Sequence, residues 1–352
     1  MKILIAGGIS FLYQLKQLSK KLNEYEIESK VVLDDDYVTD FPSKNIKGFF
    51  RTKKKFHKLI STFKPDVVLV DRPSKFALEI INSKIPLFLI LRGHYWLQNE
   101  WNKKNIYKNL FLQKLLQIRF NIDKKVFDGA TAILPLCEYL IDVVKEYHPQ
   151  QNVSVFVEGI DSTNWEKYDG LKLNHPCVGL VQRAHHWAKS SEMLILKKVL
   201  PQMPLVHFYW AGGGTIEKEI LDKLKQFQNF HWLGSLNYPG EVRKFLSEID
   251  VYLLPTGMET TPLSLKEAQL MEKPVISTSV GGTPETMIDG TTGFLVEQGN
   301  ENQMISKLNI LLNDESKAKQ MGKEGRKFIK KKFGFDSSVK NLLLILQSFQ
   351  DK

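Results

Sequence analysis

Short apolar runs rich in β-branched residues alternate with longer stretches of helical spacing, and this alternation constrains the fold more than any other feature of the sequence. The runs lack a strict alternation of apolar and polar residues, which indicates strands that are buried on both faces. Such strands form parallel sheets that helices cover on both sides. The sequence therefore predicts an α/β fold of repeated βα units.

The βα pattern runs through the chain twice, with a break near residues 159–170. Expected strands cover residues 2–6, 29–33, 66–70, 86–91, 130–135 and 153–157, then 176–181, 205–210, 229–232, 250–254, 274–277 and 293–295. Expected helices cover residues 12–22, 74–82 and 102–127, then 190–200, 215–227, 239–247, 262–272, 284–288, 301–312, 316–332 and 336–350. Two doubly wound, Rossmann-like domains fit a chain of 352 residues. Ligands bind beyond the carboxyl ends of the strands in such sheets, so residues just after strands are the site candidates.

Two glutamates follow the expected strand that ends at Leu254, in the spacing Glu259-x7-Glu267. Glu259 lies on a loop and Glu267 on the helix that follows, for which Thr261 is a suitable N-cap and Pro262 a suitable first residue. The free N–H groups at the start of this helix favour an anion, most simply a phosphate. Glu267 could accept hydrogen bonds from a ribose diol, and Glu259 from a sugar hydroxyl. Two solvated surface carboxylates are the alternative.

The segment around this pair resembles glycosyltransferase family 4, whose members are retaining enzymes of the GT-B fold with an E-x7-E signature. The resemblance is carried by residues 250–268, 273–278, 280–285 and 289–296. It implies that Glu267 binds the ribose hydroxyls and that Glu259 contacts the donor sugar. It also implies that the backbone near Thr261, Pro262 and Leu263 lines the pyrophosphate and the sugar.

Arg183 and Lys189 follow the first expected strand of the second half. A nucleotide sugar releases a nucleoside diphosphate, and fixed cations lower the barrier by stabilising the charge that builds on it. The family has an arginine and a lysine at similar spacing, which implies this role for both residues here. One of them being a plain surface charge is the alternative. His185 and His186 lie between them, and without a third ligand nearby they are not assigned to a metal.

Glycine turns follow other strands. Gly212 begins a run of three glycines, and the family has a similar turn near the nucleotide. Leu233 matches the position where the family's backbone meets the base. Gly7 and Gly8 follow the first strand without a G-x-G-x-x-G fingerprint, which argues against a dinucleotide site. The resemblance implies that this pair approaches the donor phosphate, with a plain strand-to-helix turn as the alternative.

His94 follows the fourth expected strand, and the family has a histidine in this region that touches the donor sugar. We therefore expect a catalytic contact from His94, with a buried, hydrogen-bonded histidine as the alternative. The sequence departs from the family at two places: Glu158 replaces an asparagine before the linker, and Thr-Thr-Pro follows Glu259 instead of Ser-Phe-Gly. Asp34-Asp35-Asp36 follows the second strand, where acidic turns are common, and is not assigned to a metal.

The resemblance implies a GT-B architecture of two Rossmann-like domains facing across a cleft. Residues 1–158 would form the acceptor domain and residues 159–335 the donor domain, with the last helix, about 336–352, packing back on the first. The expected activity is retaining transfer of a sugar from a nucleotide-sugar donor to a hydroxyl of a glycan or glycolipid, as in cell-envelope or surface glycan biosynthesis. No metal or other cofactor is expected, because side chains and helix ends neutralise the diphosphate in such enzymes.

Three alternatives stay open: a sugar-nucleotide-binding protein of this fold without transfer activity, a sugar-nucleotide epimerase and a nicotinamide-dependent oxidoreductase. The missing G-x-G-x-x-G motif counts against the last of these. Cys137 and Cys177 lie in apolar, strand-like surroundings, so both are expected to be buried free thiols. Their spacing from histidines does not indicate zinc.

Positive charge is concentrated in the first half of the chain, where residues 44–125 contain 19 basic and 5 acidic residues. Basic and aromatic residues interleave over residues 49–58 and 96–125, a mixture typical of surfaces that contact acidic membranes. No nucleic-acid-binding motif is present. A cytoplasmic protein that contacts the inner face of the membrane is therefore expected, with a solvated basic surface as the alternative.

Overall fold

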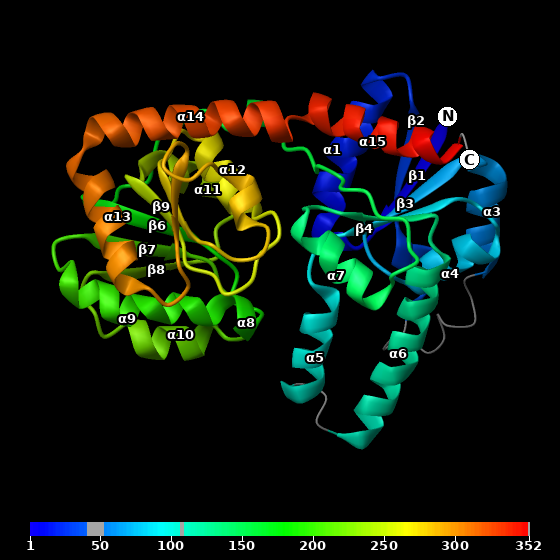
Figure 1. Cartoon of the computed structure of the whole chain (residues 1–352), viewed down its shortest axis with the longest axis horizontal. Coiled ribbons are helices and arrows are strands. Elements are labelled where there is room, and N and C mark those ends of the chain that lie inside the picture. The colour runs from blue at the N-terminus through cyan, green and yellow to red at the C-terminus, as the bar shows by residue number, and fades with distance from the viewer. Residues whose placement is uncertain (41–52, 106–108, 351–352) are drawn as a thin grey trace. The chain divides into compact units, whose positions relative to one another are not determined.

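The computed structural model describes residues 1–40, 53–105 and 109–350. The chain divides into two compact units (Figure 1). The amino-terminal unit comprises Met1–Gly159 and Phe335–Lys352, and the carboxyl-terminal unit comprises Ile160–Gly334. The amino-terminal unit is therefore built from two separate pieces of the sequence.

The amino-terminal unit contains a parallel sheet of five strands in the order β2-β1-β3-β4-β5. The strands are β1 (Lys2–Gly7), β2 (Glu28–Leu33), β3 (Val67–Val70), β4 (Leu87–Leu91) and β5 (Ala132–Pro135). Its helices are α1 (Leu12–Glu24), α3 (Lys53–Phe63), α4 (Lys75–Asn82), α5 (Tyr95–Asn105), α6 (Leu110–Gly129), α7 (Tyr139–Tyr147) and α15 (Phe335–Gln350). The order of the strands reverses between β1 and β3, so the carboxyl ends of these two strands form the topological switch point.

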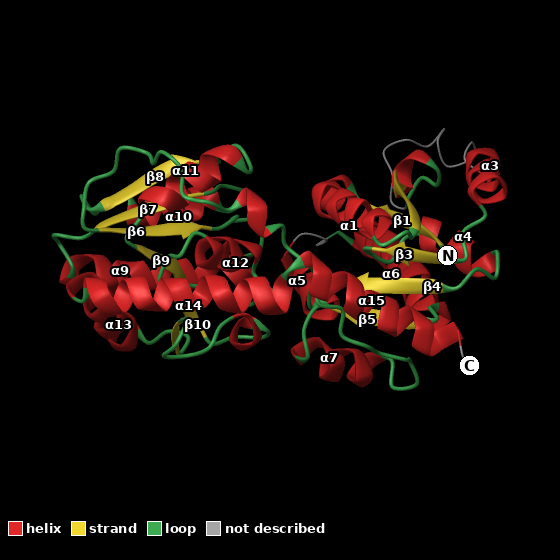
Figure 2. Ribbon diagram, turned by 90° about the horizontal axis from the view of Figure 1, so that it is seen from above, coloured by secondary structure: helices red, strands yellow, loops and turns green. Residues whose placement is uncertain are grey.

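Apolar side chains cover both faces of this sheet, as the continuous apolar strands require. On one face, Ile3 and Ile5 of β1 pack with Leu15 of α1 and Leu342 of α15. On the other, Leu4 of β1 belongs to a cluster that draws on α3, α4, α6 and α7. Figure 2 shows the strands of each unit lying between helices. The helix at the end of the chain is thus a core element of the amino-terminal unit.

The carboxyl-terminal unit contains a parallel sheet of six strands in the order β11-β10-β9-β6-β7-β8. The strands are β6 (Cys177–Val181), β7 (His207–Ala211), β8 (Phe230–Gly234), β9 (Val251–Leu254), β10 (Val275–Thr278) and β11 (Gly293–Val296). Its helices are α8 (Trp187–Ser190), α9 (Leu196–Val199), α10 (Glu217–Leu224), α11 (Gly240–Glu248), α12 (Leu263–Leu270), α13 (Glu301–Asn313) and α14 (Glu315–Phe333). The switch point lies between β6 and β9.

Most expected strands occur within two residues of their predicted bounds, but the strand expected over residues 153–157 is wrong. The segment lies beside β5, with backbone hydrogen bonds from Ile133 to Asn152, Ser154 to Ile133 and Phe156 to Pro135, but only Val153 and Ile133 form a bridge, so no regular strand results. The single helix expected over residues 102–127 is two helices, α5 and α6. The helix expected over residues 284–288 is a short 3-10 turn at Thr283–Thr286. Helices α3 and α7 were not predicted.

Within the described residues, none of the helices combines the length and the apolar character that a membrane-spanning segment needs.

Candidate functional site

The switch point of the carboxyl-terminal sheet gathers the charged residues singled out in the sequence. Arg183 and Lys189 follow β6, and Glu259 follows β9. Strands β6 and β9 are hydrogen-bonded neighbours, so the segments beyond their carboxyl ends start side by side. This is the place where open parallel sheets bind ligands.

An ion pair joins Lys189 to Glu259 at this switch point. Glu259 is buried, with 8% of its surface exposed, whereas the Lys189 side chain is 30% exposed. The backbone fixes the same junction, since the N–H of Gly257 donates to the Lys189 carbonyl at 2.9 Å. Two residues predicted separately from different strands are therefore in contact.

Arg183 lies on the same segment as Lys189 but is exposed. Its carbonyl accepts a hydrogen bond from the Ser190 hydroxyl at 3.0 Å, which fixes the backbone of the segment. Among the described residues its guanidinium has no ion-pair partner. The backbone of Arg183 is thus fixed at the carboxyl edge of the sheet, and its guanidinium faces solvent.

Helix α12 begins one residue later than the sequence predicted. Pro262, not Thr261, is the N-cap residue, and no side chain caps the helix. The reason is that Pro262 has an extended ψ of 116° while its carbonyl accepts the first helical hydrogen bond, from the N–H of Lys266 at 3.3 Å. Leu263 is consequently the first helical residue. The first N–H groups of the helix remain without intrahelical partners, as at any helix start.

Glu267 is almost completely buried on α12, with 2% of its surface exposed. Among the described residues its Oε1 has no hydrogen-bond partner, while Tyr238 hydrogen-bonds the carboxylate. Burial raises the pKa of Glu267 to about 7, and the bond from Tyr238 and the charge of Lys266 offset only part of this rise. A buried carboxylate with an unpaired oxygen is costly unless a ligand completes its hydrogen bonds.

The glycine turn after β7 allows close backbone approach to the segment after β6. Gly212 has φ of 155°, and a Cβ at this position would lie 2.0 Å from the carbonyl oxygen of Gln182. Its N–H donates to the Gly234 carbonyl at 2.8 Å, which joins it to the end of β8 beside half-buried Leu233. These turns therefore lie together along the same edge of the sheet.

The switch point of the amino-terminal sheet holds a second polar group, built on Gly7 and Gly8. The N–H of Gly8 donates to both oxygens of Asp71 at 3.3 Å, and a Cβ on Gly7 would lie 2.5 Å from the Asp71 carboxyl carbon. Asp71 follows β3 and is 4% exposed. Burial raises its pKa to about 6, although the charges of Arg92 and Arg72 act in the opposite direction. The glycines thus have a structural role here, as close neighbours of a buried carboxyl group.

His94 caps helix α5, which begins at the next residue. Its Nδ1 accepts a hydrogen bond from the N–H of Leu97 at 3.1 Å, so the neutral ring carries its proton on Nε2. Partial burial lowers the pKa of His94. The hydrogen-bonded histidine that was the alternative to a catalytic contact is therefore present, and it is half-buried.

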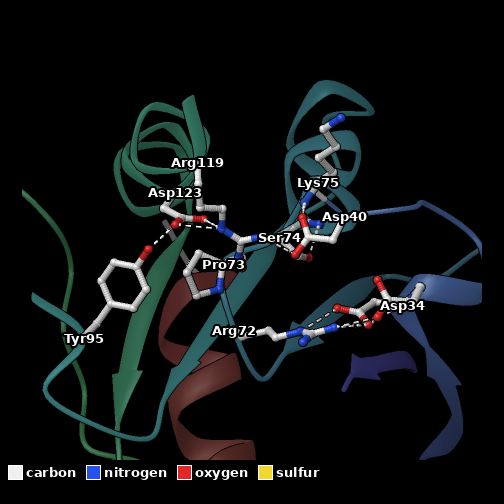
Figure 3. Close-up of polar contacts among 11 residues, drawn as sticks. Asp34, Asp40, Arg72, Pro73, Ser74, Lys75, Tyr95, Arg119 and Asp123 are labelled. Atoms are coloured by element: carbon white, nitrogen blue, oxygen red, sulfur yellow. Dashed lines mark hydrogen bonds and ion pairs between the residues drawn. The ribbon is translucent and has the colours of Figure 1, made fainter. Parts of the chain in front are cut away.

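Arginines pair with acidic residues that follow β2 and with one on α6 in the amino-terminal unit (Figure 3). Arg72 donates to Asp34 through Nε at 3.0 Å and through Nη2 at 2.8 Å, and also contacts Asp35 at 3.2 Å. Arg119 of α6 pairs with Asp123 and with Asp40. Asp34 and Asp35 of the acidic run are therefore engaged by an arginine side chain.

Glu158, which departs from the family pattern, also pairs with an arginine. Its carboxylate lies 2.6 Å from the guanidinium of Arg92, which in turn lies 4.3 Å from the ring centre of Phe11. The side chain thus joins the end of β4 to the segment that leaves the amino-terminal sheet.

A cavity of about 430 Å³ opens between α5, α6 and the end of α7. Its walls combine aromatic and amide side chains. They include Tyr95, Trp96, Asn99, Gln117, Asn121 and Tyr147. Trp96 and Tyr147 stack with ring centres 4.6 Å apart. Aromatic rings beside amide groups can bind a molecule with apolar faces and hydroxyl edges, such as a sugar.

Two residues that contact these groups were not predicted from the sequence: Tyr238, which hydrogen-bonds Glu267, and Asp71. Tyr238 lies in the loop after β8, where spacing gave no reason to select it. Asp71 directly follows the third strand, so its position at a strand end was a usable signal. Its burial against Gly8 became visible only in the fold.

Comparison with known proteins bears on the carboxyl-terminal unit most directly. Residues 161–328 match the family model for glycosyl transferases group 1. Over 174 residues the chain is 39% identical to the capsular polysaccharide biosynthesis glycosyltransferase CapM of Staphylococcus aureus, an alignment that covers 48% of this chain and 45% of CapM. The chain thus spans less than half the length of this relative.

Similar solved structures cover both units. A sucrose-phosphate synthase from Thermosynechococcus elongatus aligns over 100% of both chains with a TM-score of 0.77 and 13% identity. Anabaena HepE, solved in complex with UDP and glucose, aligns over 99% of this chain and 100% of its own with a TM-score of 0.72 and 16% identity. The fold is therefore GT-B, with two Rossmann-like α/β domains. Within it, residues 161–328 match a family model of glycosyltransferase enzymes.

Proposed function

We propose that the protein is a retaining glycosyltransferase that moves a sugar from a nucleotide-sugar donor to a hydroxyl group of a glycan or glycolipid. The observation that carries the proposal is Glu267, a buried carboxylate with an unpaired oxygen on the helix beside the switch point. A ribose diol supplies two hydroxyl donors to such a group. The HepE structure with UDP and glucose supports a nucleotide-sugar donor for this fold.

The residues at the β6–β9 switch point suit the departure of a diphosphate. Arg183 and Lys189 stabilise the negative charge that grows on the leaving group. In this proposal the backbone at Thr261, Pro262 and Leu263 lines the pyrophosphate and the sugar, and Glu259, which pairs with Lys189, accepts from a sugar hydroxyl. When the donor displaces the Lys189–Glu259 pair, the lysine turns to the diphosphate and the carboxylate to the sugar.

Retention fits a same-face substitution. The bond from the anomeric carbon to the diphosphate oxygen breaks, and a bond from that carbon to the acceptor oxygen forms on the same side. The acceptor proton passes to the leaving diphosphate. The Nε2–H of His94 is available to a sugar hydroxyl in this scheme, and no step uses a metal.

The acceptor is assigned to the amino-terminal unit. Its cavity between α5 and α6 offers the stacked rings of Trp96 and Tyr147 beside amide groups, which suits the apolar face and hydroxyl edge of a sugar. CapM acts in capsular polysaccharide biosynthesis, which supports a surface glycan as the acceptor class.

Ligand binding and donor turnover test the proposal directly. Screening UDP-, GDP- and ADP-sugars by thermal shift is expected to give one nucleotide class that raises the melting temperature, because a ligand that binds only the folded state stabilises it by mass action. The same donor should release its nucleoside diphosphate slowly in water and faster with acceptor. Stabilisation without diphosphate release would identify a binding protein, and an epimerised nucleotide sugar would identify an epimerase. No stabilisation by any donor would overturn the proposal.

Peripheral contact with acidic membranes through α3 is a further part of the proposal. This helix exposes Lys54, Lys55, His57 and Lys58 and buries Phe56. Residues 49–52 of the same basic and aromatic run lie outside the described part of the chain. Exposed lysines on one helix can bind anionic headgroups without any spanning segment.

Co-sedimentation with liposomes tests this contact. Vesicles containing phosphatidylglycerol are expected to retain the protein, and vesicles of phosphatidylcholine are not. Replacing Lys54 and Lys55 with alanine should lower membrane affinity by about fivefold for each lysine. Lys218→Ala, which removes an exposed lysine from the other unit, is the matched control. Equal binding to both kinds of vesicle would exclude the electrostatic contact.

A further inference from the structure

The edge of the carboxyl-terminal sheet opposite the proposed donor site carries a cluster of metal-ligating side chains. Cys177 is the first residue of β6, His175 lies two residues before it, and Asp250 directly precedes β9. One ligand atom from each residue lies within 4.8 Å of the other two. Since β6 and β9 are neighbours, the sheet itself brings these residues together.

We propose that His175, Cys177 and Asp250 bind a divalent transition metal, with zinc as the best match. Imidazole nitrogen, thiolate sulfur and carboxylate oxygen are the usual protein ligands of zinc. The Sγ of Cys177 lies 3.6 Å from the Nδ1 of His175, close to the roughly 3.6 Å between sulfur and nitrogen ligands in a tetrahedral zinc site. The Nδ1 of His175 lies 2.8 Å from an Asp250 oxygen, so these two groups must separate slightly when a cation enters.

The groups around the cluster orient it as an outer shell does in metal sites. The Nε2 of His175 lies 3.0 Å from a carboxylate oxygen of Glu248, which presents Nδ1 to the cluster. Metal-binding histidines characteristically donate the second ring N–H to such a carboxylate. The Asp250 oxygen is in turn held by the N–H of Cys177 at 2.7 Å. Two of the three ligands are therefore already positioned by hydrogen bonds.

The carboxylates at the cluster favour a cation. Asp250 lies 2.8 Å and Glu248 3.0 Å from the ring nitrogens of His175. Such negative charges stabilise a bound metal, and the metal in turn holds a coordinating thiol as the thiolate. The side chains of His175 and Asp250 are 42% and 40% exposed, so an ion and a water molecule as fourth ligand can enter from solvent. Lys273 is a nearby cation, and its Nζ donates to the Ser247 carbonyl at 2.8 Å.

The bound metal would be structural. Cys177 and Asp250 lie at the amino ends of β6 and β9, and Arg183 and Glu259 lie beyond their carboxyl ends, about 15 Å away along the strands. The metal would link the segment that leads into β6 to Asp250, which lies two residues after Glu248 at the end of α11. This role is separate from donor binding and agrees with sugar transfer that uses no metal.

Cobalt spectroscopy of the full-length, tag-free protein tests the assignment. Titration of the reduced protein with Co²⁺ is expected to produce tetrahedral d–d bands and a near-ultraviolet thiolate-to-cobalt charge-transfer band, both removed by zinc. Cys177→Ser should lose the charge-transfer band, whereas Cys137→Ser, which removes the other buried free cysteine, should retain it. Far-ultraviolet circular dichroism confirms that each variant is folded.

Glu248→Gln provides a second test that does not alter a ligand. It should weaken cobalt affinity by about 10- to 100-fold and leave the charge-transfer band unchanged at saturation, because Glu248 orients His175 without binding the metal. Zinc should also raise the melting temperature of the wild-type protein without changing the rate of donor hydrolysis. Absence of the charge-transfer band in the wild type, or its survival in a folded Cys177→Ser variant, would overturn the site.

Discussion

Replacing Arg183 with alanine is expected to lower the turnover of the nucleotide-sugar donor by about 10²- to 10³-fold while leaving the melting temperature unchanged. The first effect is the usual loss when one preorganised group that stabilises developing negative charge is removed. The second follows from the structure, because the Arg183 side chain is exposed and its guanidinium has no ion-pair partner among the described residues. A residue with no role in folding can thus report on chemistry alone.

Single-turnover rates and thermal scans of the same preparation measure the two effects separately. Lys197→Ala is the matched control, since Lys197 is an exposed cation on α9 of the same unit, and it should retain wild-type turnover. Arg183→Lys should recover part of the rate, because the charge is kept while the bidentate geometry is lost. Wild-type turnover in Arg183→Ala would remove this residue from the proposed mechanism.

Replacing Glu267 with glutamine is expected to weaken donor binding by about 10- to 100-fold at pH 8, the usual range for hydrogen bonds to a charged group. The carboxylate can accept from both ribose hydroxyls, whereas an amide offers one acceptor oxygen. Wild-type affinity should also fall as the pH drops below about 7, because protonation removes an acceptor site and burial raises the pKa of Glu267 to about 7. Glu267→Gln should lack this part of the pH dependence.

Calorimetric titrations with the nucleoside diphosphate at pH 5.5 to 8.5 measure these affinities. The diphosphate also titrates in this range, so the informative quantity is the ratio of wild-type to variant affinity. That ratio should rise with pH and level off about one unit above the pKa of Glu267, which is about 7. A ratio near one at every pH would break the assignment of Glu267 to the ribose.

The burial of Glu267 also fixes the direction in which pH changes the free energy of unfolding. The Glu267 carboxyl loses its proton near its ordinary pKa of 4.5 in the unfolded chain but near 7 in the folded protein. Between these values the folded state binds more protons, so the free energy of unfolding of the wild type falls as the pH rises. Denaturant titrations should show that Glu267→Gln lacks this decline.

Much of the fold could be predicted because it follows from local patterns. Apolar runs located all six strands of the carboxyl-terminal sheet and five of the amino-terminal sheet. The strand expected over residues 153–157 is not a regular strand, because an apolar run indicates burial beside the sheet and does not fix how continuous the hydrogen-bond ladder is. The start of α12 was misplaced because either Thr261 or Pro262 can end an extended segment, and only the backbone conformation decides between them.

The site was predictable where its residues follow strands and unpredictable where it depends on distant contacts. Glu259 and Lys189 were selected separately, but their ion pair depends on the pairing of β6 with β9. The burial of Glu267 likewise could not be predicted, because carboxylates on helices usually face solvent and the sequence shows only that Glu267 lies on a helix. The cluster of His175, Cys177 and Asp250 escaped notice because its third member lies 73 residues beyond the cysteine and meets it only across two strands.

The two-piece construction of the amino-terminal unit constrains how the chain acquires its structure during synthesis. The carboxyl-terminal unit is one continuous segment, whereas one face of the amino-terminal sheet is covered partly by Val339, Leu342 and Leu346 of α15. The ribosome makes α15 only after all of the carboxyl-terminal unit. Apolar surface on β1 and α1 therefore stays exposed to water or to chaperones until α15 is made. The 175 residues of the carboxyl-terminal unit are made before that and can fold first. Of the two units, the one whose synthesis starts earlier is the later to complete its core.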